Sequence, residues 1–258
     1  MNTFNIDPIL DSLPTKPHSR LTDKYMFLDT RKVVDDMRDL GYEATGFRRA
    51  KGRTVNAQYG LHEVEFMRPQ DLARDGSFSH EAPRILFMNS YDGSRKARFA
   101  AGIIRFACLN GMITGDLLAN LTFLHMGEYE EELMKQMKEI AEETPKVFSK
   151  IDAYRDIKLD DEIYLDMADQ ALQLRYPKEE DRPIVDPAAL IMPRRPEDHQ
   201  ADLYTTFNVL QENIIRGGVP GTLPDGRSRI MQPVKNIERS NTLNRQLWGL
   251  LETTAELA

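Results

Sequence analysis

The sequence predicts an α+β fold, in which an N-terminal antiparallel β-sheet with one early helix is followed by a mostly helical C-terminal half packed on it. Two patterns predict it. Short alternating apolar stretches, separated by glycines and by Asp-Gly and Asn-Gly turn signals, fill residues 43–125. Beyond residue 128, apolar residues recur at helical spacing. We therefore expect an irregular N-terminal arm (1–20), a β-rich α+β core (21–127) and a helical part (128–258) that contains a proline-rich linker at 176–196.

The N-terminal arm contains Pro8, Pro14 and Pro17 and shows little periodicity. Such a segment is expected to be irregular and to pack on a neighbour, as a strap in a homo-oligomer.

Residues 25–28 predict a short apolar strand, and residues 31–40 predict the early helix. Asp29 or Thr30 is suited to cap the start of this helix, and Gly41 is suited to end it.

The β-rich core begins with a predicted hairpin whose tip lies near residues 51–53. The tip would display four cations: Arg48, Arg49, Lys51 and Arg53. Further strands are predicted at 84–89, 98–109 and 120–125.

The helical part begins at about Glu128, and Thr144-Pro145 interrupts its first helix. Further helices are predicted at 160–175, 201–215 and 240–256. Residues 221–229 are expected to form a loop. Trp248, on the last helix, is expected to pack in the hydrophobic core rather than to stack on a base.

Charge is unevenly distributed along the chain, whose formal net charge is −7. Residues 43–110 hold eleven Lys and Arg against seven Asp and Glu, whereas residues 128–186 hold nine against eighteen. The basic half is suited to phosphates and the acidic half to a basic partner. The alternative is that both are ordinary solvated surfaces.

Several classes of protein are excluded by composition and spacing. No run of about 18 apolar residues occurs, so we expect no membrane partner. The N-terminus has no secretory pattern, and the single cysteine, Cys108, cannot form an internal disulfide, so we expect a cytoplasmic protein. Five scattered histidines without CxxC or HExxH spacing predict no metal, and the lack of a P-loop or GxGxxG turn predicts no cofactor.

The most informative stretch runs from residue 84 to residue 115 and contains two polar turns. Asn89 and Asp92 lie in the first turn, and Asn110 lies in the second. The structural interpretation is that such side chains bond their own backbone, and the functional one is that they surround a ligand. His125 ends this section, in a capping, core or catalytic role.

Arg105 lies inside the apolar run between the two turns, where an arginine is costly to bury without a partner. The candidate partners are a carboxylate, such as Asp92 or Glu212, and a phosphate.

The helix at 201–215 is rich in hydrogen-bonding groups: Asn208, Gln211, Glu212 and Asn213. The plain interpretation is a polar helix surface on which Glu212 reaches Arg216 one turn later. Arg216 then lies beside exposed backbone at Gly217-Gly218. A basic spread follows, with Arg227, Arg229, Lys235, Arg239 and Arg245, which is suited to a phosphate backbone.

Five motifs occur in one order: NSYDGS, GIIRFACLNGM, HMG, FNVLQENIIRGG and RSRIMQPVKNIERSNTLNRQLWGLLE. In this order they resemble the phage/plasmid-like protein family of unknown function, also called domain of unknown function family 932, from about Tyr25 to the C-terminus. Tyr91 stands where the family usually has histidine. The resemblance implies a bacteriophage or plasmid origin and no defined activity. It marks a polar cluster of Asn89, Asp92, Arg105, Asn110, His125 and Asn213.

Three functions are weighed. The leading hypothesis is a mobile-element accessory protein that binds nucleic acid, with single-stranded DNA favoured, in strand annealing or recombination. Its contacts would be Arg48, Arg49, Lys51, Arg53, Arg216, Arg227, Arg229 and Lys235. The alternative is a counter-defence protein that binds a host protein through the acidic segment. An enzyme built on Asn89, Asp92, Arg105 and His125 ranks last, because no familiar catalytic spacing occurs.

Overall fold

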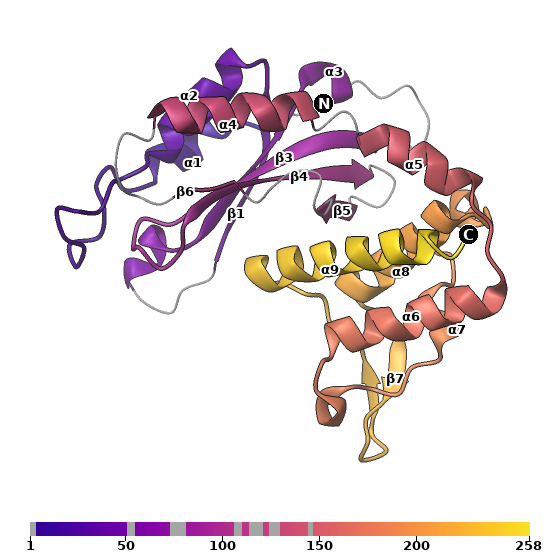
Figure 1. The fold of residues 1–258 in the computed structure, drawn as a ribbon. Coiled ribbons are helices and arrows are strands. Elements are labelled where there is room, and N and C mark those ends of the chain that lie inside the picture. Colours follow the sequence, from indigo (N-terminus) through magenta and orange to yellow (C-terminus); the bar gives the residue numbers. More distant parts are fainter. Residues whose placement is uncertain are drawn as a thin grey trace. The chain divides into compact units, whose positions relative to one another are not determined.

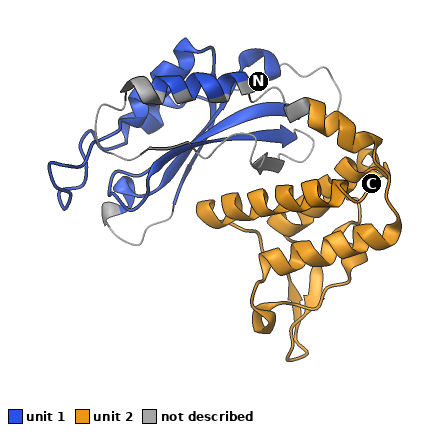
Figure 2. Ribbon diagram, viewed as in Figure 1, with its two compact units in different colours: residues 1–106, 116–146 blue, residues 107–115, 147–258 orange. Residues whose placement is uncertain are grey.

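The computed structural model describes residues 4–50, 55–72, 81–105, 110–113, 121–123, 130–143 and 147–258. The chain divides into two compact units (Figure 2): unit 1 spans residues 1–106 and 116–146, and unit 2 spans residues 107–115 and 147–258. Unit 1 contains an antiparallel sheet with an early helix, and unit 2 is mostly helical, so the predicted α+β class is confirmed. Within the described ranges, no helix is both long and apolar enough to cross a membrane.

The described sheet of unit 1 runs in chain order, and each long strand is antiparallel to the next: β1 (Glu43–Arg49), β2 (His62–Met67), β3 (Glu81–Asn89) and β4 (Ala97–Arg105). A short strand, β6 (Leu121–Phe123), pairs with the start of β4. The pairing of β1 with β2 confirms the predicted hairpin. The hairpin tip, with Lys51 and Arg53, lies outside the described residues, as does Cys108.

Helices lie on one side of this sheet (Figure 1): α1 (Asp7–Asp11), α2 (Thr30–Asp39) and α4 (Glu130–Glu143). The predicted early helix is α2, and the Asp29 carboxylate caps it by accepting a hydrogen bond from the Arg31 N–H (3.0 Å). A 3-10 helix, η1 (Val55–Tyr59), and a single turn, α3 (Pro69–Leu72), lie in the connections between strands. Phe66, Phe87 and Phe99 are fully buried, so the core of unit 1 rests on the three central strands.

The strand predicted at residues 25–28 is wrong, since this segment is not part of any ladder among the described residues. Side chains hold it instead. The Tyr25 hydroxyl donates to the Ser90 carbonyl (2.9 Å), and the Asn89 amide donates to the Leu28 carbonyl (2.9 Å). Because these bonds satisfy the backbone locally, no partner strand is needed.

The N-terminal arm packs on its own unit and not as a free strap. Ile6, Leu10 and Leu13 are buried. The Arg31 guanidinium donates to three carbonyls of the arm, those of Leu10 (2.8 Å), Leu13 (3.1 Å) and Pro14 (2.9 Å). The apolar side chains of the arm and several of its backbone carbonyls are therefore already in contact with the same chain. The arm was expected to pack on a neighbouring subunit.

Unit 2 is a set of packed helices: α5 (Val147–Asp156), α6 (Asp161–Arg175), α8 (Leu203–Arg216) and α9 (Ile237–Ala255), with the short strand β5 (Asn110–Ile113). The Trp248 ring of α9 is fully buried and meets the rings of Phe207 and Tyr154 edge-on. This confirms the predicted core position of Trp248.

The proline-rich linker contains short helical turns: η3 (Glu179–Asp181), α7 (Pro187–Leu190) and η4 (Pro196–Asp198). The loop expected at residues 221–229 is instead part of a hairpin, in which β7 (Pro220–Thr222) pairs with β8 (Ser228–Ile230). The Pro-Asp-Gly segment forms its turn, with Gly226 at φ +84°.

His62, at the start of β2, is a fully buried histidine in unit 1. Its Nε2 lies 2.8 Å from Thr30 Oγ1, and its ring meets the Tyr91 ring edge-on. Burial lowers the pKa of His62 from 6.5 to about 4, and the charge of Arg49 acts in the same direction.

We predict that His62 weakens unit 1 in acid. Its pKa is lower in the folded chain than in the unfolded chain, so its contribution is complete above pH 6.5 and is lost as the pH falls toward 4. Between pH 7.5 and pH 5 this should remove about 2 kcal/mol of unfolding free energy. Urea titrations followed by circular dichroism should show a smaller acid loss for His62→Gln. The exposed His199→Gln variant should behave as the parent, and an equal acid loss in all three proteins would contradict the assignment.

Candidate functional site

Asn89, in the first polar turn, is fully buried and bonded at both ends of its amide. Its Nδ2 donates to the Leu28 carbonyl (2.9 Å) and to Thr30 Oγ1 (3.3 Å), and its Oδ1 accepts from the Ser90 N–H (2.8 Å). The neighbouring Tyr91 hydroxyl accepts from the Thr30 N–H (3.0 Å). Asn89 and Tyr91 therefore hold the start of α2 against the end of β3.

Asp92 and Ser94 close the same turn. The Asp92 carboxylate accepts from the Ser94 N–H (2.9 Å) and lies 3.6 Å from the Arg20 guanidinium. Gly93 between them has φ +68°, and a Cβ there would lie 2.8 Å from the Leu21 side chain. These bonds follow the structural interpretation of the turn.

Arg105 lies at the other end of the β3–β4 pair. Its guanidinium Nε lies 3.8 Å from the Glu81 carboxylate, and both side chains are almost fully buried. Glu81 was not among the expected partners of Arg105. Asn89 is eight residues further along β3, which places it roughly 26 Å away along the strand.

The polar cluster suggested by the motifs is thus not assembled among the described residues of unit 1. Asn89 and Asp92 share a turn, and Arg105 is remote from it. His125 lies outside the described residues, and so does the side chain of Asn110, which begins β5. The catalytic set of Asn89, Asp92, Arg105 and His125 gains no support from this arrangement.

In unit 2, the polar face of α8 is buried and not on the surface. Asn213 is 2% exposed; its Oδ1 accepts from Arg194 Nε (2.7 Å), and its Nδ2 donates to the Leu190 carbonyl (2.8 Å). The Gln211 amide donates to Asn244 of α9. The plain interpretation of this face as helix-surface polarity is therefore wrong, because the linker and α9 cover it.

Glu212 is also buried, and Arg195 of the linker binds it with two nitrogens, at 2.8 and 2.6 Å. The same guanidinium contacts Asp198 at 2.9 Å. Arg216 reaches Glu212 as predicted, though only at 4.0 Å. The main partner of Glu212 thus comes from 17 residues upstream.

The Arg-Gly-Gly end of α8 requires glycine at Gly217. This residue has φ +70° and ψ −145°, and a Cβ would lie 2.2 Å from the Met231 carbonyl oxygen. The Gly218 N–H donates to the same carbonyl (2.8 Å), and Arg194 donates to the Gly217 carbonyl. The Arg-Gly-Gly motif therefore ends α8 and bonds the chain after it to the Met231 segment.

The residues expected to contact nucleic acid differ in whether the described chain already pairs their charge. In unit 1, the Arg48 guanidinium is paired with Glu63, and Arg49 lies over the Phe47 ring. In unit 2, Arg227 pairs with Asp225 across the hairpin turn (2.6 Å). Arg229 and Lys235 are exposed and have no ion pair among the described residues.

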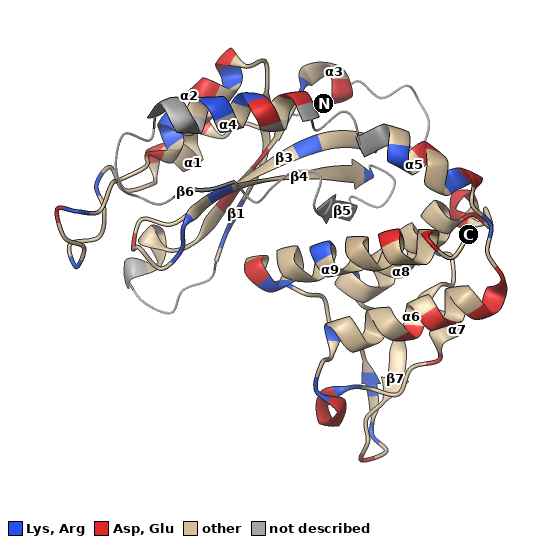
Figure 3. Cartoon of the chain, viewed as in Figure 1, with Lys and Arg blue, Asp and Glu red and all other residues tan. Residues whose placement is uncertain are grey.

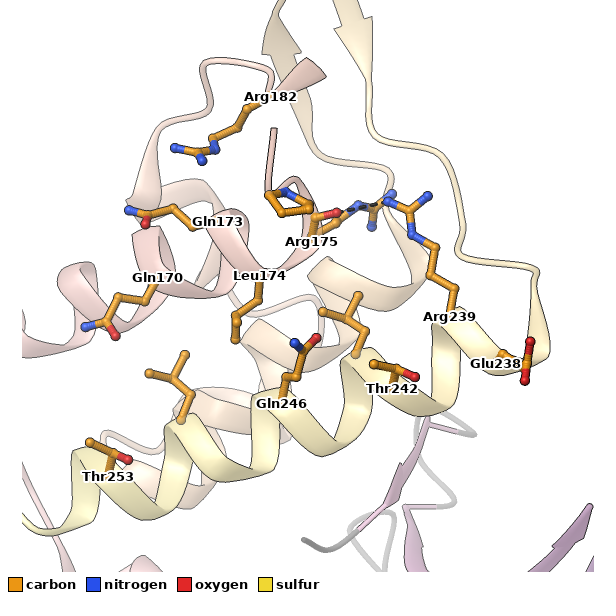
Figure 4. A pocket seen from close by; sticks show the side chains of 13 residues that line it. Gln170, Gln173, Leu174, Arg175, Arg182, Glu238, Arg239, Thr242, Gln246 and Thr253 are labelled. Atoms are coloured by element: carbon orange, nitrogen blue, oxygen red, sulfur yellow. Dashed lines mark hydrogen bonds between the residues drawn. The ribbon is translucent and has the colours of Figure 1, made fainter. Parts of the chain in front are cut away.

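A groove of about 920 Å³ lies between α6 and α9 of unit 2 (Figure 4), and we call it the α6–α9 groove. Arg175 and Arg239 lie together at one of its ends, and Arg182 and Glu238 also line it. Neutral polar side chains continue the lining, among them Gln170, Gln246 and Thr253.

Arg175, the last residue of α6, is 4% exposed. Its terminal nitrogens donate to the carbonyls of Ile214 and Gln232, and its buried Nε has no hydrogen-bond partner in the described structure. Burial lowers the pKa of Arg175, and the positive charges of Arg239 and Arg229 also lower it, against the opposing effect of Tyr176.

The other two arginines use only part of their hydrogen-bonding capacity. Arg239 donates one nitrogen to the Arg175 carbonyl (2.9 Å), and Arg182 donates Nε to the Tyr176 carbonyl (3.1 Å). Among the described residues, no carboxylate lies within ion-pair distance of Arg175, Arg182 or Arg239. The groove therefore has positive charge that the described chain does not neutralise, which suits it to an anion.

The groove offers little for other chemistry. Within the described residues there is no group of His, Cys, Asp and Glu side chains that could hold a metal ion. Its lining contains no aromatic ring and no histidine or cysteine. Charge and hydrogen bonding are what its lining side chains supply.

A family model described as "Domain of unknown function (DUF932)" matches residues 17–248. The chain belongs to this family. Two relatives in Escherichia coli (strain K12) are each 27% identical to it: "UPF0380 protein YfjQ" over 92% of this chain and 84% of the relative, and "UPF0380 protein YafZ" over 91% and 84%. No solved structure matches. The resemblance drawn from the motifs is confirmed, and the family description states no activity.

Arg175 and Arg182 were not predicted as functional residues, and Arg239 was noted only within the basic spread. A signal for Arg175 was present. It lies four residues after Ala171, on the apolar stripe of its helix, so the sequence places an arginine on a buried face. The same reasoning had drawn attention to Arg105.

We predict that Gly217→Ala destabilises unit 2 by more than about 2 kcal/mol, because the new Cβ meets backbone and the φ value is unfavourable. Gly226→Ala is the matched control, since it also has positive φ but has nothing within 4 Å of the Cβ position. Its cost should be about 1 kcal/mol. Urea unfolding followed by the fluorescence of Trp248, the only tryptophan, measures both. Equal losses would show that the contact with Met231 is unimportant.

Proposed function

We propose that this protein binds nucleic acid, with single-stranded DNA as the preferred ligand, through phosphate contacts in the α6–α9 groove of unit 2. The observation that carries the proposal is the set of three groove arginines without a carboxylate partner among the described residues. Guanidinium groups bind phosphate oxygens with paired, charge-assisted hydrogen bonds.

Cations outside the groove extend this surface. Arg229 of the β7–β8 hairpin is close enough to act electrostatically on Arg175, and Lys235 lies two residues before α9. In Figure 3 the blue of Lys and Arg lies on the hairpin and on the first turn of α9, beside the red of one acidic residue at each place. A backbone that runs along the groove would thus meet positive charge on more than one element.

The lining favours binding that depends little on base sequence. It contains no aromatic ring on which a base would stack, and its neutral side chains are glutamines, threonines, leucines and one proline. Phosphate contacts position a strand without reading its sequence. A volume of about 920 Å³ suits a few nucleotides of one strand better than the body of a duplex.

An accessory role in strand annealing or recombination fits such binding, together with the mobile-element origin that the family resemblance implies.

The competing proposal is that the protein binds a host protein through its acidic surface. It draws on Asp160, Asp161 and Glu162 at the start of α6, which are exposed and have no ion pair among the described residues. The two proposals therefore place the ligand on different surfaces of unit 2, one basic and one acidic.

We predict that the protein binds a fluorescein-labelled 20-nucleotide poly-dT strand in an anisotropy titration and that binding weakens as salt rises. The logarithm of the affinity should fall by about 0.7 per phosphate contacted for each decade of salt. Arg239→Gln should weaken binding and reduce this slope by about one contact, because it removes a groove cation.

Arg245→Gln is the matched control, since it removes the same charge from the same helix at a residue that does not line the groove. It should change the affinity less than twofold. Absence of binding at 50 mM salt would reject nucleic-acid binding, and equal effects of the two substitutions would reject the groove as its location.

A further inference from the structure

We propose that the arginine end of the α6–α9 groove is a site for a phosphate monoester, so that the protein holds the phosphorylated end of a strand more tightly than its interior. This inference rests on the proposed function and specifies which part of the ligand lies where. It is carried by the three arginines that line the groove, Arg175, Arg182 and Arg239, against one lining carboxylate, Glu238.

The first argument is the charge of this end. Arg175 is 4% exposed, and Arg239 donates to its carbonyl at 2.9 Å, so two cations from α6 and α9 are adjacent. Arg182 of the linker also lines the groove. Among the lining residues of the groove, Glu238 is the one carboxylate. Three positive charges and one negative charge leave an excess of two.

The second argument is the match between this excess and the ligand. A phosphodiester inside a strand carries one negative charge, whereas a phosphate monoester carries about −1.5 to −2 near pH 7 and has three acceptor oxygens. The monoester therefore balances the excess more fully, and its oxygens can accept from several guanidinium groups at once.

The third argument is the buried donor. Arg175 Nε is buried and has no hydrogen-bond partner among the described residues. Both terminal nitrogens are engaged by the carbonyls of Ile214 and Gln232, which fixes the guanidinium in place. These carbonyls and the Tyr176 ring, whose centroid lies 5.1 Å from Arg175 Cζ, compensate the buried charge only in part, and an anion bound nearby would lower its remaining cost.

The shape of the groove agrees with an end site. In Figure 4, Arg175 and Arg239 lie together at one end, whereas Gln170 and Thr253 lie toward the other. From Arg239 to Thr253 the groove follows α9 for fourteen residues, or roughly 21 Å. A terminal phosphate at the arginines would leave this length for the first nucleotides of the strand.

The test compares four probes by anisotropy competition at one salt concentration: a 12-nucleotide strand with a 5′-phosphate, the same strand with a 3′-phosphate, the same strand with hydroxyls at both ends, and thymidine monophosphate. We expect one phosphorylated strand to bind about tenfold more tightly than the unphosphorylated strand. Arg239→Gln should reduce this ratio to below threefold, and Arg245→Gln should leave it unchanged. Arg182→Gln, at another lining residue of the groove, is a second variant should Arg239→Gln fail to fold.

The outcomes separate the two proposals. Equal binding of all three strands overturns the end site and leaves nucleic-acid binding intact. If no strand binds, thymidine monophosphate and, as its control, thymidine are compared by thermal melting. A rise in the melting temperature with the monophosphate alone rejects strand binding and keeps the monoester site. If neither strands nor thymidine monophosphate bind, both proposals fail.

Discussion

Arg175 is the residue on which the organisation of unit 2 depends, because it places a full positive charge at the junction of three segments. It ends α6, its guanidinium holds the carbonyls of Ile214 at the end of α8 and of Gln232 before α9, and its own carbonyl accepts from Arg239. Burying this charge is unfavourable unless backbone acceptors or an anion compensate it. The carbonyls supply part of that compensation, and under the proposed function an anion bound in the groove beside Arg175 would supply more.

The polar residues that stand out in the sequence are mostly used inside the fold. Asn89 and Tyr91 fix the start of α2, Asn213 and Arg194 fix the linker to α8, and Gly217 allows the chain to turn beside Met231. Buried polar groups need such partners, so conspicuous motif residues are often structural. The cations in the groove differ in that their charge is not balanced by a carboxylate of the described chain. This contrast, and not the motifs themselves, locates the proposed function.

The sequence was a good guide to features set by local physics and a poor one to features set by distant segments. Alternation and turn signals predicted β1 to β4, and helical periodicity with an Asp29 cap predicted α2. The burial of Glu212 could not be read from α8, because its partner Arg195 arrives from the linker. The hairpin at Gly226 was predictable from its Pro-Asp-Gly turn, but its strands are only three residues long each. Arg175 is intermediate between these two kinds of feature. Helical periodicity indicates that its charge is buried, but not which groups surround the guanidinium.

The most direct test of the central claim is hydrogen exchange measured by mass spectrometry with and without a saturating single-stranded oligonucleotide. It asks where on the chain the nucleic acid lies. The account predicts slower exchange in peptides that cover residues 170–182 and 238–253, which line the groove. Protection confined to the β1–β2 hairpin around Arg48 and Arg49, with no change in the groove peptides, would contradict it.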